Sequence, residues 1–516
     1  MEALIRPVPS IVSAVRKGGG YAIRALLAGV AFWCAAAPLP ALAANTDTTE
    51  AVSALFRRVE TDPARLRAFL HAMPKGGDLH NHLAGAVYAE SYLDWAGSGG
   101  LCVDPGTHTL SRPPCDPAHP SLAEMQTRDP GFRDAMIDAL SMRAFVPHPG
   151  DASGHDHFFA TFHKFDAAAT GRIGEALAEE AHRAAAEHVG YLEIMWYPRV
   201  RESAALGLAH PFLPTDFPAD LAAITPGIPS LLASARADTD QAMARMRQLL
   251  RCDAPDADPG CRVTIRFQTF LLRVLPPGAV FAQMAYSYAL VAADPRFVGV
   301  NIVAPEDDPV ALRDYDLHMR MFGFFHQAHP EVRLSLHAGE LALGLVPPEA
   351  LESHIREAVE IAGASRIGHG VDIASERDPI GLLREMAQRH VTVEINQTSN
   401  EQILGVHGSE HPFPLYRAHG VPLTLSTDDE GVERIDLTHE YVRAVESWKL
   451  DYPALKDMAR SAVANSFLAG APLPAGTDIA HPPSPSLLRS SDKARQQWGL
   501  EQDLAAFEKT VLAAPP

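Results

Sequence analysis

Leu334-Ser335-Leu336-His337-Ala338-Gly339-Glu340 is the stretch that says most about the fold. It is an apolar, strand-like run that ends in a histidine and a carboxylate three residues apart. Three other strand-like runs also end in histidines or acids. They are residues 73–83 with His80 and His82, residues 366–370 with His369, and residues 423–429 with Asp428 and Asp429. Each set of polar residues stands where a strand is expected to give way to its loop.

Apolar, β-branched runs alternate with amphipathic stretches through most of the chain. The runs cover residues 190–196, 263–274, 297–304, 332–337, 391–395 and 421–426, and the amphipathic stretches include residues 173–188 and 348–361. This alternation is typical of a parallel sheet with crossover helices. About eight such units favour a (β/α)8 TIM-type barrel over an open sheet, and barrel active sites form at the carboxyl ends of the strands.

Two long insertions interrupt this pattern, at about residues 98–150 and 198–260. The first is rich in Pro, Gly, Asp and His, and the second has Pro-rich loops with one helical stretch near residues 238–250. Each insertion contains a close pair of cysteines, Cys102 with Cys115 and Cys252 with Cys261. An even number of cysteines in an exported chain favours disulfides within these pairs, although three pairings are possible and free thiols are the alternative. Extra helices are expected near the C-terminus, where a final helical segment docks on the barrel.

The N-terminus has the pattern of a secretory signal peptide. Basic residues precede an apolar run at residues 25–37, and the small residues Ala41 and Ala43 follow it. This order predicts a signal peptide of residues 1–43, export to the periplasm or the exterior, and a single domain of residues 44–516. A membrane anchor is the alternative, but the apolar run is shorter than the ~20 residues that span a bilayer.

The charge of the chain limits its partners. The formal net charge of the 516 residues is −19, and the predicted signal peptide contains more basic than acidic residues. A strongly acidic mature chain argues against binding nucleic-acid polymers or anionic membrane surfaces. A small-molecule substrate remains compatible with this charge.

The strand-end residues form a candidate zinc site. His80 and His82 point to the same face of an extended strand and can reach one ion. With His337 and Asp428 they supply three imidazoles and one carboxylate, a donor set that suits a single zinc ion with a position open for water. Bound zinc lowers the pKa of that water to about 7.

Three polar residues are left over for acid–base chemistry and substrate contact. Glu340 and His369 are natural acid–base partners. Asp429 adjoins Asp428, and two adjacent acids do not easily ligate one ion, so Asp429 is free to contact the substrate.

The ordered motifs MPKGGDLHNHLAG (73–85), SLHAGE (335–340), RIGHGV (366–371), EINQTSN (394–400) and LSTDDEGV (425–432) resemble the adenosine deaminase family, including its secreted growth-factor-like branch. Residues 158–165, 191–198 and 465–467 fit weaker landmarks of the same family. The resemblance runs from about residue 73 to residue 467 and is broken by the two insertions.

The resemblance implies a role for each strand-end residue. His80, His82, His337 and Asp428 resemble the family's zinc ligands. Glu340 resembles the acid that protonates the purine ring nitrogen, and His369 resembles the histidine that orients and deprotonates the zinc-bound water. Asp429 resembles the acid that contacts the imidazole side of the purine, and Gly339 belongs to the substrate-contacting set. The implied reaction is hydroxide attack at C6 of the purine, a tetrahedral intermediate and loss of ammonia, with one zinc ion per chain.

The chain departs from the family at the positions that read the sugar and the base. Ala84 stands where the family has an acid that contacts ribose, and Ala304 stands where the family has a glycine that hydrogen-bonds the base. Asn396-Gln397 replaces a Cys-Pro pair. Deamination is therefore expected, with the identity of the purine left open.

Three other functions are alternatives to an adenosine-type deaminase. One alternative is a deaminase of another aminopurine derivative. A second is a non-deaminating hydrolase that uses two metals bridged by a carboxylated lysine, but no lysine stands at the end of a strand between His82 and His337, since Lys164 falls in a predicted helix. A third is an extracellular binding protein without turnover, against which the complete acid–base and ligand set argues. The zinc deaminases of the cytidine type are excluded because the chain has no P-C-x-x-C segment.

Overall fold

The computed structural model describes residues 41–513, with side chains from residue 48 onward. Residues 1–40 of the predicted signal peptide lie outside the described residues. Among residues 41–513, no helix combines the length and the apolar character that crossing a membrane requires.

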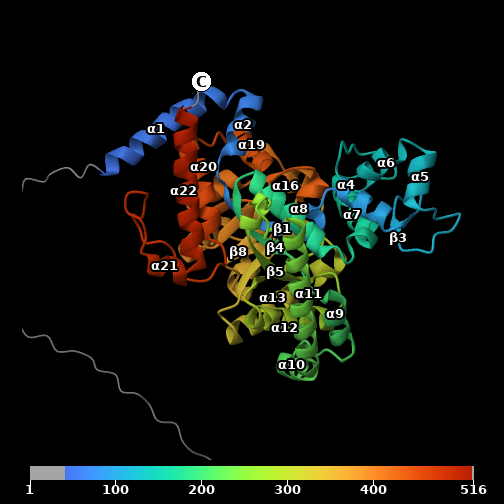
Figure 1. Ribbon diagram of the computed structural model, residues 1–516. Coiled ribbons are helices and arrows are strands. Elements are labelled where there is room, and N and C mark those ends of the chain that lie inside the picture. The colour runs from blue at the N-terminus through green and yellow to red at the C-terminus, as the bar shows by residue number, and fades with distance from the viewer. Residues whose placement is uncertain (1–40, 514–516) are drawn as a thin grey trace, which may run out of the picture.

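Eight parallel strands form the barrel expected from the sequence, in the order β1-β4-β5-β6-β7-β8-β9-β10 (Figure 1). They are β1 (Gly76–His82), β4 (Val189–Met195), β5 (Thr264–Leu272), β6 (Phe297–Val303), β7 (Arg333–Ala338), β8 (Arg366–His369), β9 (Thr392–Ile395) and β10 (Leu423–Leu425). A parallel bridge between Asn81 and Asp428 joins the last strand to the first. The closure places residues from both ends of the sheet beside each other.

Helices connect the strands and cover the barrel. Those that follow β1 and β4–β7 are α7 (Gly154–Ala169), α8 (Ile173–Ala186), α12 (Pro277–Ala293), α13 (Pro309–Ala328) and α14 (His354–Glu357). Those that follow β8–β10 are α15 (Pro379–Arg389), α16 (Gln397–Leu404), α17 (Phe413–Ala418), α18 (Glu430–Glu433), α19 (Leu437–Trp448) and α20 (Tyr452–Ala464). The amphipathic stretch 348–361 is not one helix: a 3-10 turn, the four-residue α14 and a π turn that ends before Gly363 (φ 81°) succeed one another.

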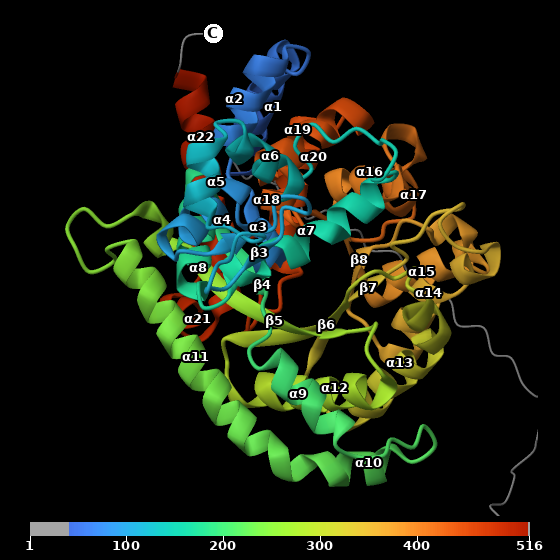
Figure 2. The same cartoon turned by 90° about the vertical axis from the view of Figure 1, so that its right-hand side faces the viewer.

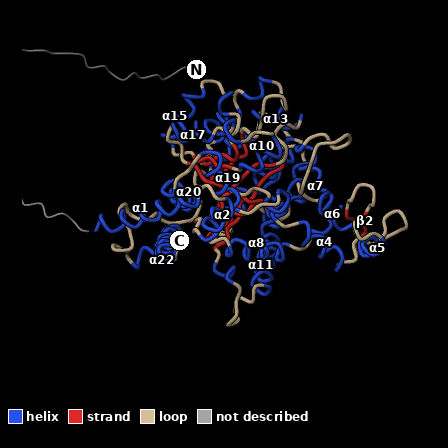
Figure 3. Tube along the Cα trace, turned by 90° about the horizontal axis from the view of Figure 1, so that it is seen from above, coloured by secondary structure: helices blue, strands red, loops and turns tan. Residues whose placement is uncertain are grey.

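The first insertion contains short elements around its disulfide. After α3 (Leu83–Ala86) and α4 (Ala89–Ser98) come β2 (Cys102–Val103), β3 (Leu110–Ser111), α5 (Leu122–Arg128) and α6 (Phe132–Ala139). Cys102 is bonded to Cys115, as predicted. Figures 1 and 3 agree that α5 and α6 lie on the side of the barrel opposite to α1 and α22.

The second insertion is more helical than its sequence indicated. It consists of α9 (Val200–Leu208), α10 (Phe217–Ile224) and α11 (Ile228–Leu249), and it ends in the predicted Cys252–Cys261 disulfide. Figure 2 shows the length of α11, which packs on α8. Its buried stripe includes Ala235, Thr239 and Ala242, and such small or polar residues do not mark a helical face in a hydrophobicity pattern.

The terminal helices pack together against the barrel. α1 (Ala41–Val59) and α2 (Pro63–Ala72) contact α20 and α19, respectively, while α21 (Pro485–Ser490) and α22 (Asp492–Ala513) close the chain. The ring of Phe69 on α2 lies 5.3 Å from that of Phe56 on α1 and 5.2 Å from that of Phe507 on α22. The C-terminal segment therefore docks on the barrel, as expected.

Candidate metal centre and active site

The predicted site residues meet inside the barrel at the carboxyl ends of the strands. His80 and His82 end β1, His337 lies near the end of β7, His369 is the last residue of β8, and Asp428 follows β10. All but His82 are buried, and His82 is partly exposed to a cavity at the barrel mouth. Residues that are up to about 350 positions apart thus share one centre because the barrel closes.

The spacing of the donor atoms fits one zinc ion. His82 Nε2 lies 3.2 Å from His337 Nε2 and 3.2 Å from Asp428 Oδ1, and His80 Nε2 lies 3.4 Å from the same oxygen. Ligand atoms that bind a zinc ion tetrahedrally at 2.0–2.1 Å are separated by roughly 3.3 Å. His80 Nε2 is also buried without a hydrogen-bond partner. The donor set and its orphaned nitrogen therefore suit zinc.

Hydrogen bonds to the far ring nitrogens orient two of these imidazoles. His80 Nδ1 lies 2.7 Å from Glu394 Oε2, and His337 Nδ1 lies 2.9 Å from Asn301 Oδ1. Since both partners are acceptors, each Nδ1 carries the proton, which leaves the Nε2 lone pair directed at the centre. Sequence reasoning missed Glu394 and Asn301. The available signal was a polar residue inside an otherwise apolar strand, at β9 and β6 respectively.

His369 also faces this centre. Its Nε2 has no hydrogen-bond partner and lies 3.6 Å from Asp428 Oδ2. The side chains of His80, His337, His369 and Asp428 offer ligand atoms within 4.8 Å of one another, so proximity alone does not separate a ligand from an acid–base group. Burial lowers the pKa of His369 to about 3, which makes its imidazole neutral.

Glu340 is placed to exchange protons with a substrate. It lines the cavity beside the cluster, and its Oε1 lies 3.7 Å from His369 Nδ1. Burial, and then the carboxylates of Asp428 and Glu306, raise the pKa of Glu340 well above its ordinary value. The raised pKa favours the protonated form of this carboxyl group, which is the form that can act as a general acid.

The carboxylate of Glu306 holds the backbone at Glu340. Glu306 accepts hydrogen bonds from the backbone N–H of Gly339 (3.1 Å) and of Glu340 (2.9 Å), and its Oε1 lies 2.6 Å from His354 Nδ1. Arg273 Nη1 is 3.5 Å from Glu306. Although burial opposes ionisation, Arg273 and His354 lower the pKa of Glu306 to about 2. The carboxylate thus stays charged. Neither Glu306 nor Arg273 was identified from the sequence, where Arg273 directly follows an apolar strand and Glu306 opens the acidic run 306–308.

Of the three residues predicted to contact the substrate, Asp429 and Ala304 line the cavity and Gly339 does not. Asp429 lines the cavity, and its carboxylate fits where Gly85 has no side chain, since a Cβ there would lie 1.6 Å from Asp429 Oδ1. Burial and the neighbouring Asp428 raise the pKa of Asp429 well above its ordinary value. Ala304 also lines the cavity, whereas Gly339 does not, and its N–H is engaged by Glu306.

Several residues around the cavity adopt a left-handed backbone. Ala304 (φ 82°), His369 (φ 69°) and Asp428 (φ 63°) all have a positive φ at or just after a strand end. This conformation costs a residue with a side chain on the order of 1–2 kcal/mol. Strain of this kind clusters at functional sites, where the surrounding structure holds side chains in place.

The cavity itself measures about 450 Å³. All of its polar lining residues belong to the cluster described above. The remaining wall is apolar and consists of Ala84, Phe158, Phe159, Phe162, Met195, Phe270, Leu272, Val303, Ala304, Pro305 and Ile403. Among the described residues that line it there is no lysine or arginine. Lys164 lies on α7 and donates to the backbone oxygen of Ala139 instead.

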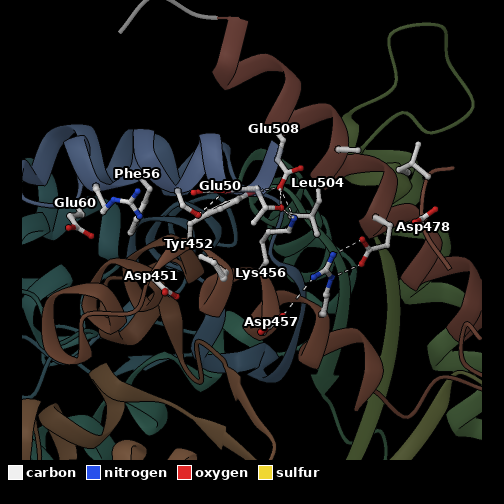
Figure 4. A pocket seen from close by; sticks show the side chains of 18 of the residues that line it. Glu50, Phe56, Glu60, Asp451, Tyr452, Lys456, Asp457, Asp478, Leu504 and Glu508 are labelled. Atoms are coloured by element: carbon white, nitrogen blue, oxygen red, sulfur yellow. Dashed lines mark hydrogen bonds and ion pairs between the residues drawn. The ribbon is translucent and has the colours of Figure 1, made fainter. Parts of the chain in front are cut away.

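A larger cavity of about 980 Å³ lies between α1, α20 and α22 (Figure 4) and contains none of the predicted site residues. Two of its basic lining residues, Lys456 and Arg460, are paired with acidic neighbours. Lys456 Nζ is 2.5 Å from Glu508 Oε1, and Arg460 binds both oxygens of Glu501 at 2.7 and 2.8 Å. These pairs connect α22 to α20, so the cavity belongs to the packing of the C-terminal helix on the barrel.

Comparisons with known proteins agree with this geometry. Residues 154–472 match the family model for adenosine deaminase. An adenosine deaminase of Clostridium perfringens is 32% identical over 136 residues, which cover 26% of this chain and 38% of that protein. The aligned segment thus spans well under half the length of this curated relative.

Two solved structures share the fold. The adenine deaminase from Arthrobacter aurescens has a TM-score of 0.53 and 16% identity, and the match covers 84% of this chain and 99% of that one. The arabidopsis ADAL complexed with IMP has a TM-score of 0.53 and 16% identity, with 85% and 99% covered. Because the family model matches more than half of the sequence, the chain belongs to the adenosine deaminase family.

Proposed function

We propose that this protein is an exported, zinc-dependent hydrolytic deaminase of adenosine or a related 6-aminopurine nucleoside. Water replaces the exocyclic amino group, and the products are ammonia and the 6-oxo purine. Membership of the adenosine deaminase family supports this reaction class. The observation that carries the proposal is the meeting of a zinc-type donor set with a buried carboxyl group, that of Glu340, in one cavity.

His80, His82, His337 and Asp428 would hold the ion. When bound, zinc lowers the pKa of a coordinated water molecule from about 16 to about 7 and so supplies a nucleophile at neutral pH. The protein's own task is to orient these ligands. Glu394 and Asn301 do so by holding the Nδ1 atoms of His80 and His337.

Glu340 is assigned as the general acid. Burial and two neighbouring carboxylates raise the pKa of this carboxyl group and so favour its protonated form. A proton donated to the ring nitrogen beside the reacting carbon prevents negative charge from building up on the purine as water adds. Glu306 fixes the backbone from which this carboxyl group reaches into the cavity.

The cavity favours an uncharged substrate. Its polar groups are confined to the cluster at one end, and no basic side chain is available among the described lining residues to neutralise a phosphate. The reacting end of the purine belongs at the polar cluster, which leaves the apolar wall for the rest of the molecule. A nucleoside or a base therefore suits this site better than a nucleotide such as the IMP found with the arabidopsis protein.

A substrate screen tests the proposal. The purified mature protein, loaded with zinc, is assayed for ammonia release with adenosine, deoxyadenosine, adenine, AMP and N6-substituted aminopurines. We expect release from at least one uncharged 6-aminopurine and at least 100-fold lower kcat/KM with AMP, an order-of-magnitude figure for a polar group left unpaired in a site. Turnover of an ester or amide without any ammonia release would instead favour a non-deaminating metal hydrolase.

Export is the second part of the proposal. The sequence of residues 1–43, in which basic residues precede an apolar run and then small residues, supports export. Two disulfides suit an oxidising compartment. Cell fractionation with sequencing of the mature N-terminus tests it. A full-length protein that stays in the cytoplasm would contradict the signal-peptide assignment.

A further inference from the structure

A chain of hydrogen bonds reaches His369 from the side away from the metal centre. It begins at Phe413, the first residue of α17, whose backbone N–H donates to His411 Nδ1 at 3.1 Å. Since His411 Nδ1 accepts this hydrogen bond, it carries no proton of its own, and the proton of the neutral ring is on Nε2. Burial lowers the pKa of His411 to about 3, which agrees with a neutral ring.

The next link fixes an amide. His411 Nε2 lies 3.1 Å from Asn400 Oδ1, and because the histidine nitrogen donates, the amide oxygen of Asn400 must face it. The amide nitrogen of Asn400 is thereby turned towards His369 and lies 3.0 Å from His369 Nδ1. All of these side chains are buried, so water does not compete for the positions.

The last link sets the proton on His369. An amide N–H₂ only donates, so His369 Nδ1 accepts and the proton of the neutral imidazole is on Nε2. Asn396 Nδ2 approaches the same Nδ1 at 3.5 Å. Glu340 Oε1 is the nearest competing acceptor, but at 3.7 Å it lies beyond hydrogen-bond distance.

We propose that Asn400 and His411 are positioning residues that hold His369 in the Nε2–H tautomer. In this tautomer His369 presents an N–H towards the centre and offers no lone pair there. It is therefore able to donate a hydrogen bond towards the centre, and in its resting state it is neither a zinc ligand nor a proton acceptor. This inference distinguishes His369 from His80 and His337, whose Nδ1 atoms face acceptors and whose Nε2 lone pairs face the centre.

The effect of the His369 tautomer on turnover rests on the proposed function, but the tautomer itself can be measured without any turnover. The tautomer is read by long-range ¹H–¹⁵N NMR on protein with ¹⁵N-labelled histidine, in metal-free and zinc-loaded forms. The His369 signals are assigned by their loss in His369→Ala. We expect the Nε2–H pattern in both forms of the wild type.

Asn400→Asp reverses the last link without changing its size. A carboxylate at position 400 accepts one hydrogen bond from His411 Nε2 and can accept another from His369 Nδ1, so the His369 tautomer should switch to Nδ1–H. We expect kcat for ammonia release to fall by about 10²–10⁴-fold, as for a catalytic histidine held in the wrong tautomer. KM should change little, because neither residue 400 nor residue 411 lines the cavity.

Two further variants complete the test. His411→Phe removes the donor that orients the Asn400 amide and should give a mixture of both His369 tautomers with an intermediate kcat. Gln388→Glu adds the same charge at an exposed position of α15 and should change neither the NMR pattern nor kcat. It is the matched control for Asn400→Asp.

The outcomes separate the two proposals. A wild-type His369 with its proton on Nδ1, or an Asn400→Asp protein with unchanged tautomer, would overturn the positioning role. Absence of ammonia release from every 6-aminopurine would overturn the proposed function, while the NMR result would still decide the tautomer. A switched tautomer with normal kcat would show that the chain sets the proton of His369 without any effect on turnover, which also contradicts the positioning role.

Discussion

Replacing Glu306 by glutamine tests how the barrel holds its general acid. The carboxylate accepts from two backbone N–H groups and lies within hydrogen-bond distance of His354 and within 3.5 Å of Arg273. A glutamine at this position keeps one oxygen, but it places an NH₂ group against donors and leaves the charge of Arg273 without its buried partner.

The expected magnitude follows from these contacts. Hydrogen bonds to a charged group contribute about 1.5–3 kcal/mol each, and removing one member of a buried ion pair costs about 3–5 kcal/mol. Because the losses share one carboxylate and are not additive, we expect the free energy of unfolding to fall by about 3–5 kcal/mol. We also expect kcat to fall by about 10–100-fold, since a displacement of about 1 Å in a catalytic group costs about 10²-fold.

Urea denaturation and steady-state ammonia release measure the two effects. The control is Glu349→Gln, the same substitution at an exposed position after β7, which should alter stability by no more than about 0.5 kcal/mol. If the free energy of unfolding of Glu306→Gln fell by less than about 1 kcal/mol and kcat were unchanged, Glu306 would not hold the backbone of Glu340 in its active position.

Three other predictions concern the metal, the disulfides and pH. The protein should contain about one zinc per chain, and His337→Ala should lose it, as measured by elemental analysis. Removing one disulfide with Cys102→Ser and Cys115→Ser should destabilise the fold by about 3 kcal/mol in urea denaturation, because the bond closes a loop of 13 residues. Burial lowers the pKa of His155, but hydrogen bonds to Asp307 and Asp156 outweigh it and raise the pKa to about 9. The protonated ring should therefore stabilise the protein fully below about pH 6.5, and its advantage over His155→Gln should vanish as the pH rises through 9.

Each of these has a result that would count against it. Two zinc ions per chain would contradict the single-ion site. A double cysteine variant as stable as the wild type would show that the loop is held by other contacts. A stability difference between wild type and His155→Gln that is constant from pH 6 to pH 10 would mean that the ion pair with Asp307 is not formed.

The sequence predicts the parts of the site that are encoded locally. His80 and His82 are two residues apart in one strand, and His337 and Glu340 share one strand end, so a short motif displays each pair. The alternation of strands and helices predicted the barrel. The closeness of the cysteines along the chain, together with their even number and the expected export, favoured the two disulfides that the structure contains.

The residues that orient the histidines cannot be recognised from short motifs, because each one contacts a histidine on another strand. Glu394 meets His80 from 314 positions away, and Asn301 meets His337 from 36 positions away. A polar residue in an apolar strand indicates that something is paired in the interior, but only the register of the closed barrel identifies the partner. Glu306, in the loop after β6, and Asn400, on α16, were missed because their partners also come from other elements, although both Glu394 and Asn400 lie within the EINQTSN motif.

Local patterns also mislead where helices are short or lined by small residues. The stretch 348–361 has a helical pattern, yet it forms three successive turns before Gly363, because the chain must return to β8 within a few residues. In the second insertion, α11 extends ten residues further towards the N-terminus than the predicted helical stretch near residues 238–250.

The measurement that tests the central claim most directly is kcat for ammonia release, with zinc content, in Glu340→Gln. The wild type should release ammonia with one zinc per chain, and the variant should keep its zinc and its fold while kcat falls by at least about 10²-fold, the lower range for general acid catalysis. His337→Ala, three residues earlier, should lose both zinc and activity. If Glu340→Gln deaminated at the wild-type rate, or lost its zinc, Glu340 would not be the proton donor and the proposed mechanism would be contradicted.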